Sequence, residues 1–174
     1  MKRDAIKNYA AHEESLGIET GPPEGNHAAV IVKAEVRETE DGRPFTYVET
    51  KAVSGPYENR HIFDRLEWFV DPKWEAADET KKMVQGIMRG NTRGFMTALY
   101  GKQWVSAPKD VEEFGPDDDY DEVARVMKTW VKHVVNLPVT VNVKHRKDKE
   151  TGEKTAAFPN LRYTARVEDE VFSL

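Results

Sequence analysis

The stretch that decides the fold is PPEGNHAAVIVKAEVRETEDGRPFTYVETKAVSGPYENRHIFD, residues 22–64. Its first half, residues 27–37, alternates apolar and polar side chains with the period of two that is typical of a half-buried strand. A polar turn centred on Asp41-Gly42 is a strong hairpin signal, and the chain returns as a second strand over residues 45–53. A third run, residues 60–70, follows the turn at 54–59, and the pattern leaves its buried face undecided. We therefore predict a three-stranded antiparallel meander, in which the first strand buries Val30, Val32, Ala34 and Val36.

Downstream of the meander, two helical regions precede two further strands. Residues 74–89 have apolar positions at helical spacing, interrupted at Gly90-Asn91 and resumed over 95–100, which predicts either one helix or a helix pair with a turn. A Pro- and acid-rich loop then leads to an amphipathic helix at residues 123–134. Alternation returns over 138–144, with Val139, Val141 and Val143 expected inward. The last strand is predicted from about residue 156 to 167, after a charged turn.

This order of elements predicts a mainly β, α+β fold. Three strands, a helical segment and two strands is the order of an OB-fold, a five-stranded antiparallel Greek-key barrel. Ligands of OB-folds lie on strands two and three and on the loops joining strands one and two and strands four and five. We expect an N-terminal arm (1–21), an OB-fold domain (22–167) with a helical insertion at about 73–136, and a short acidic tail (168–174).

Composition narrows the class of protein. The chain has 39% hydrophobic and 33% charged residues and a mean hydropathy of −0.72, which is typical of a soluble globular protein. No stretch has the length of a membrane span, and no apolar segment follows the basic N-terminus, so we expect a cytoplasmic protein. The absence of Cys excludes disulfides, thiolate nucleophiles and Cys-ligated metals. The net charge of −5 argues against a protein that coats duplex DNA by bulk positive charge. A protein with this net charge can still carry a local basic groove.

Two motifs in residues 22–64 carry a family resemblance. They are Pro23-Glu24-Gly25-Asn26-His27-Ala28-Ala29-Val30-Ile31 and Gly55-Pro56-Tyr57-Glu58-Asn59-Arg60-His61-Ile62-Phe63-Asp64. The chain resembles phage and prophage proteins once catalogued as a domain of unknown function and now regarded as OB-fold single-stranded-DNA-binding proteins. His27 stands where that family usually has an aromatic residue, and Asn59 stands where it often has Gly. The second change is mild because Asn also tolerates positive φ. The resemblance covers residues 22–72, with a looser similarity over 137–163.

A single-strand site needs cations that replace condensed counterions and aromatic faces on which bases stack. The predicted hairpin at 144–154 holds five Lys or Arg against three acids. Each aromatic taken singly also fits a packing role, and such a hairpin also fits a solvated turn. If the resemblance holds, phosphates are tracked by Lys33, Arg37, Arg60, Lys144, Arg146 and Arg162. The bases would then stack on Tyr47, Tyr57, Phe63 and Phe158.

The expected function is sequence-independent coating of single-stranded DNA in phage replication, recombination or repair, without catalysis or a cofactor, in the host cell cytoplasm. A protein-interaction or structural module that reuses an OB-like barrel is one alternative. A metal-dependent nuclease using Asp64, Glu67 and Asp71 is another, although Asp64 and Glu67 would point to opposite faces of a regular strand. The sequence leaves open whether the protein forms a homo-oligomer. The acidic residues of the tail are consistent either with recruitment of replication or recombination proteins or with an ordinary solvated terminus.

Overall fold

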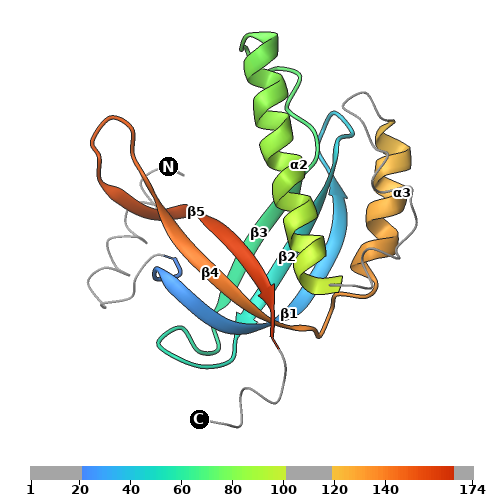
Figure 1. Ribbon diagram of the computed structural model, residues 1–174. Helices are drawn as coiled ribbons and strands as arrows, with labels where there is room; N and C mark the ends of the chain where they lie inside the picture. Colours follow the sequence, from blue (N-terminus) through green and yellow to red (C-terminus); the bar gives the residue numbers. More distant parts are fainter. Residues whose placement is uncertain (1–20, 101–118, 167–174) are drawn as a thin grey trace, which may run out of the picture.

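The seven elements found in the described residues follow the predicted order of three strands, helices and two strands. We describe residues 21–100 and 119–166 of the computed structural model (Figure 1). Among these residues, neither helix combines the length and apolar character that a membrane crossing requires. The fold is α+β. The elements are β1 (Gly25–Glu38), β2 (Pro44–Ala52), β3 (His61–Glu67), α2 (Asp78–Tyr100), α3 (Tyr120–Val131), β4 (Pro138–Lys147) and β5 (Lys154–Ala165).

The strands form one antiparallel sheet in the order β3-β2-β1-β4-β5. β1 is long enough to pair twice: residues 25–30 pair with β4, and residues 29–38 pair with β2. The predicted meander is therefore confirmed as β1–β3. Figure 1 shows the sheet curling, so that its edge strands β3 and β5 turn toward the same side. Within the described residues these two strands do not pair with each other, so the sheet stays open where a barrel would close.

A β-bulge in β1 changes which side chains are buried. The register shifts between Ile31 and Lys33. Ala29 and Ile31 are fully buried before the shift, whereas Val32 is 37% exposed and Ala34 packs against the core after it. The prediction that Val30 and Val32 belong to the buried face was therefore wrong. An extra residue in one strand reverses the alternation, and residue types alone do not mark where it is inserted.

Helices α2 and α3 cover the inner face of the curled sheet. α2 contacts β5 and β3, and α3 contacts β1 and β2. α2 runs unbroken through Gly90-Asn91, so the alternative of a helix pair with a turn was wrong. The second predicted helix is confirmed as α3, and the carboxylate of its N-cap residue Asp119 accepts a hydrogen bond from the backbone N–H of Asp121. The shared core includes Ile31, Val48, Phe95, Met127, Trp130, Val139, Val141 and Val143.

Three predicted segments lie wholly or largely outside the described residues. They are the N-terminal arm, most of the acidic loop before α3, and the acidic tail.

Candidate nucleic-acid interface

The outer face of β1, β2 and β3 carries cations and aromatic rings side by side. Strand pairing sets Lys33 opposite Glu49 and Arg37 opposite Phe45, and it sets Glu49 opposite Phe63. These side chains point away from the core because Val48, Ile62 and Leu66 occupy the inner positions. We call this surface the β1–β3 face. It consists of Lys33, Glu35, Arg37, Phe45, Tyr47, Glu49, Lys51, His61, Phe63, Arg65 and Glu67.

The centre of the β1–β3 face is a pair of stacked rings. The ring centroids of Tyr47 and Phe63 lie 6.3 Å apart at an interplanar angle of 27°. Phe63 is 57% exposed, a large value for an aromatic side chain in a folded protein. The Arg37 guanidinium carbon lies 3.8 Å from the Tyr47 centroid, close enough for a cation–π contact. Arg37, Tyr47 and Phe63 therefore form a row that crosses three strands, and this row contains three of the predicted site residues.

The structure adds to this surface residues absent from the predicted set. Arg65 lies over the Phe45 ring at 3.9 Å, and the His61 ring centroid is 6.2 Å from that of Phe63. Phe45 has the same strand parity as Tyr47, and Arg65 the same parity as Phe63. This signal was available in the sequence for β2, but it could not be used for β3 while the buried face of that strand was undecided.

Four basic side chains of the face, those of Lys33, Arg37, His61 and Arg65, have an acidic neighbour on the same face. Glu35 forms ion pairs with Arg37 and with Lys33, the latter at 3.6 Å. Glu67 pairs with Arg65 at 2.7 Å, and Glu49 hydrogen bonds to His61. The Arg37 hydrogen bond holds the pKa of Glu35 below its usual range, so Glu35 is ionised at neutral pH. Phosphate would have to compete with these carboxylates for the same guanidinium and ammonium groups.

Tyr57 and Arg60 do not belong to this face. Tyr57 is only 6% exposed and is part of the hydrophobic core. Its ring meets His27 edge-on at 5.9 Å, and Arg60 covers it at 4.8 Å. A ring enclosed in this way offers no open surface to a base, so we do not retain Tyr57 among the stacking residues. Asn59, beside it, has a positive φ of 65°, a conformation that Asn tolerates.

The cations of the β4–β5 hairpin lie on the other half of the sheet. Lys144 and Arg162 are exposed, and strand pairing sets them opposite Asn160 and Asn142. Arg146 is also exposed and donates a hydrogen bond to Asn160 Oδ1 at 3.1 Å. β1 separates these strands from β2 and β3, so the predicted site residues fall into two groups rather than one row. The side chain of Phe158 lies outside the described part of the structure.

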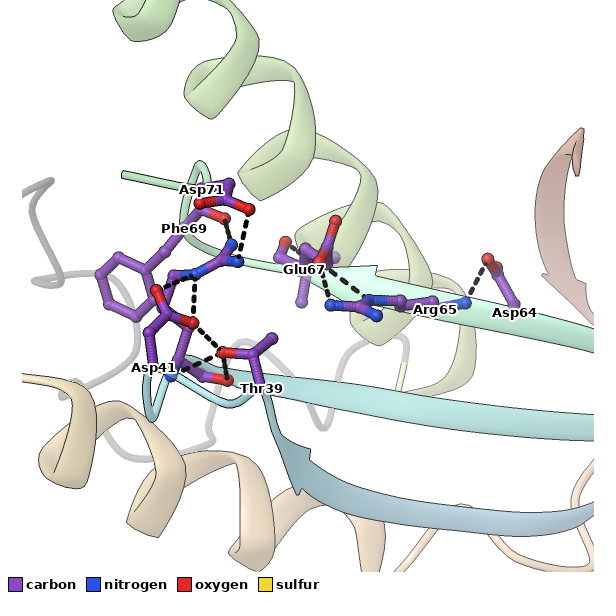
Figure 2. Close-up of polar contacts among 9 residues, drawn as sticks. Thr39, Asp41, Asp64, Arg65, Glu67, Phe69 and Asp71 are labelled. Atoms are coloured by element: carbon purple, nitrogen blue, oxygen red, sulfur yellow. Dashed lines mark hydrogen bonds and ion pairs between the residues drawn. The ribbon is translucent and has the colours of Figure 1, made fainter. Parts of the chain in front are cut away.

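The predicted nuclease carboxylates do not converge. Figure 2 shows Asp64, Glu67 and Asp71 at separate points along the chain: Asp64 accepts from the backbone N–H of Arg65, Glu67 pairs with the Arg65 guanidinium, and Asp71 is directed elsewhere. Asp71 pairs with the buried guanidinium of Arg43 at 3.3 Å, and Asp41 also pairs with that guanidinium. Arg43 thereby ties the β1–β2 turn to the segment after β3. Within residues 21–100 and 119–166, no three His, Asp or Glu side chains are grouped as a metal site would require.

Asp64 points into the core and links the two edge strands. Its Oδ2 accepts a hydrogen bond of 2.9 Å from the hydroxyl of Tyr163 on β5. Its Oδ1 accepts a second hydrogen bond from the backbone N–H of Arg65 at 2.7 Å. Burial raises the pKa of Asp64 above its usual value, and these two hydrogen bonds only partly oppose the rise. Burial also raises the pKa of Tyr163, so its hydroxyl stays protonated and acts as the donor.

We expect Asp64→Asn to stabilise the protein at neutral pH. A raised pKa in the folded state means that the stability contributed by Asp64 is complete below its unfolded pKa, near 3.8, and is lost as pH rises through the folded pKa. Asn keeps both contacts without the buried charge, because its oxygen accepts from Arg65 and its amide donates to Tyr163. Urea denaturation at several pH values should show a gain at neutral pH that disappears in acid.

Asp148→Asn is the matched control with the opposite sign. Backbone N–H groups of Thr151 and Glu150 donate to the Asp148 carboxylate and lower its pKa. Its charged form therefore stabilises the fold; this contribution is present above the unfolded pKa and is lost as pH falls through the folded pKa, so the substitution should cost stability at neutral pH and little in acid. An Asp64→Asn effect that stays the same at every pH would contradict the assignment of a buried, neutralisation-prone carboxylate.

Fold and surface together define a class of protein: an α+β domain built on a curled sheet, with aromatic rings and ion-paired cations on the outer face and helices on the inner face. A family model described as "Protein of unknown function (DUF669)" matches residues 8–105. The match spans more than half of the chain, so this protein belongs to the DUF669 family. No curated protein matches the chain.

Proposed function

We propose that this protein binds single-stranded DNA without sequence preference, as a phage-type OB-fold protein acting in replication, recombination or repair in the host cytoplasm. The observation that carries the proposal is the row of Arg37, Tyr47 and Phe63 across β1, β2 and β3. Stacking on an exposed ring is open to every base, since every base has a π-face. Cations beside the rings would neutralise the phosphates that connect the stacked bases.

The topology supports the finer assignment to the OB-fold. The sheet order β3-β2-β1-β4-β5, with the helices inserted between β3 and β4, is the OB order apart from pairing between β3 and β5. The Asp64–Tyr163 hydrogen bond spans those two edge strands. The β1–β3 face coincides with the strand-two and strand-three surface on which OB-folds bind oligonucleotides. We therefore infer an OB barrel whose closure is made by side chains and by α2.

Fluorescence anisotropy tests the proposal directly. A labelled single strand of about thirty nucleotides and its matched duplex are titrated with the protein at two salt concentrations, with chelator present. We expect tight binding to the single strand that weakens with salt, and much weaker binding to the duplex, whose bases are already stacked on each other. Equal affinity for both would contradict stacking, and no binding to either would favour an interaction module.

Neutralising Glu35 should tighten binding. The carboxylate pairs with Arg37 and Lys33, so Glu35→Gln releases two cations toward the phosphates. We expect a gain of a few-fold in affinity at low salt, since exposed ion pairs are worth less than about 1 kcal/mol. Glu75→Gln makes the same charge change at an exposed position outside the β1–β3 face and serves as the control. Equal gains in both variants would indicate a net-charge effect and would contradict competition at Arg37.

A further inference from the structure

The outer side of α2 exposes two large apolar side chains. Met83 is 61% exposed and Ile87 is 56% exposed, and with Phe63 they are the most exposed large apolar residues among those described. They stand four residues apart, so they lie on one side of the helix. The opposite side carries the buried Thr92, Phe95 and Met96. Figure 1 shows the first half of α2 extending beyond the end of the sheet.

Glycines continue this outer side toward the C-terminal end of α2. Gly90 and Gly94 follow Met83 and Ile87 on the same side, and Gly86 lies at its edge. A Cβ added at any of the three would meet nothing within 4 Å. Each glycine costs a helix about 1 kcal/mol relative to alanine. Packing within the described part of the chain therefore does not explain why these positions are glycines. The close approach of another backbone would explain it.

We propose that the stripe formed by Met83, Ile87, Gly90 and Gly94 is where a second copy of this chain docks, helix against helix and antiparallel. The spacing from Met83 to Ile87 equals the spacing from Gly90 to Gly94. A two-fold axis passing between residues 88 and 89 therefore seats both apolar side chains of each copy over both glycines of the other. Such an isologous contact is self-complementary, as closed dimers require.

Shape favours the antiparallel arrangement over the parallel one. In the proposed register Met83 of one copy faces Gly94 of the other and Ile87 faces Gly90, so each large side chain meets a position that has no side chain. Parallel pairing would instead set Met83 and Ile87 against themselves and the glycines against each other.

Sedimentation of the full chain over a range of concentrations tests the proposal. We expect a monomer of 19.9 kDa in equilibrium with a dimer of twice that mass. Ile87→Glu and Gly90→Leu should each weaken the dimer roughly tenfold or more, one by burying a charge and the other by blocking close approach. Gly90→Leu has room in the monomer and raises helix propensity, so it separates dimer loss from unfolding. Val135→Glu, at a residue 38% exposed outside α2, is the control.

Cysteine cross-linking tests the register, because the chain has no Cys of its own. In the proposed register Ile87 faces Gly90 of the other copy, so the double variant Ile87→Cys/Gly90→Cys should give a covalent dimer on oxidation. Ile87→Cys alone should not, since the two positions 87 are then too far apart for a disulfide. A monomer at every concentration, a dimer that resists both stripe substitutions, or equal cross-linking of the single variant would overturn the proposal.

Discussion

Phe63→Ala lowers the affinity for a single strand by roughly 5- to 140-fold in the anisotropy assay, if bases stack on the β1–β3 face. The range follows from about 1 to 3 kcal/mol per stacked base. Phe63 is the most exposed ring described on this face, and its neighbour Tyr47 holds it in a stacked pair. Because its side chain is 57% exposed, its removal should change the free energy of unfolding little. The affinity loss can therefore be assigned to the site.

Trp74→Ala is the control for this experiment. Trp74 is also an exposed aromatic, at 38%, but it lies after β3 and outside the β1–β3 face. Its removal should leave the single-strand affinity unchanged. If Phe63→Ala and Trp74→Ala bind the strand as the wild type does, stacking on this face is wrong, even if the protein binds DNA by another surface.

Trp68→Ala should produce the largest loss of stability. The Trp68 ring is 1% exposed, and the guanidinium carbons of Arg89 and Arg93 lie 5.1 and 5.6 Å from its centroid. It joins the end of β3 to α2, so its truncation opens a cavity beneath the helix that covers β3 and β5. We expect a cost of about 3 to 5 kcal/mol, a large share of the about 5 to 15 kcal/mol typical of a domain.

Urea denaturation measures this effect, with Trp68→Phe and Trp74→Ala beside it. Trp68→Phe keeps most of the apolar volume and should cost less than Trp68→Ala. Trp74→Ala removes the same side chain from an exposed position, where substitutions usually change stability by about 0.5 kcal/mol or less. Equal midpoints for Trp68→Ala and Trp74→Ala would show that Trp68 does not anchor α2.

An element could be predicted from the sequence when the interactions that determine it act between residues close together in the chain. The β1–β2 hairpin could be predicted because Asp41-Gly42 fixes a turn locally, and Gly42 has a positive φ of 83°. The inner face of β4 could be predicted because Val139, Val141 and Val143 alternate with polar residues without interruption, and the structure confirms that these three side chains are buried. The buried face of β1 could not be predicted, because its bulge depends on pairing with β2 across the sheet. The faces of β3 were undecided for the same reason, since Ile62 and Phe63 are both apolar.

The features of the candidate site also fall into those set by local sequence and those set by tertiary structure. The sequence by itself determined the residue types and the strands that carry Lys33, Arg37, Tyr47 and Phe63. Only the tertiary structure decided that Tyr57 is buried, that Asp64 turns inward to Tyr163, and that the hairpin cations lie across β1 from the aromatic row. Alternation and turn chemistry act between near neighbours in the chain, whereas burial and convergence depend on which distant strands pair and how the sheet curls.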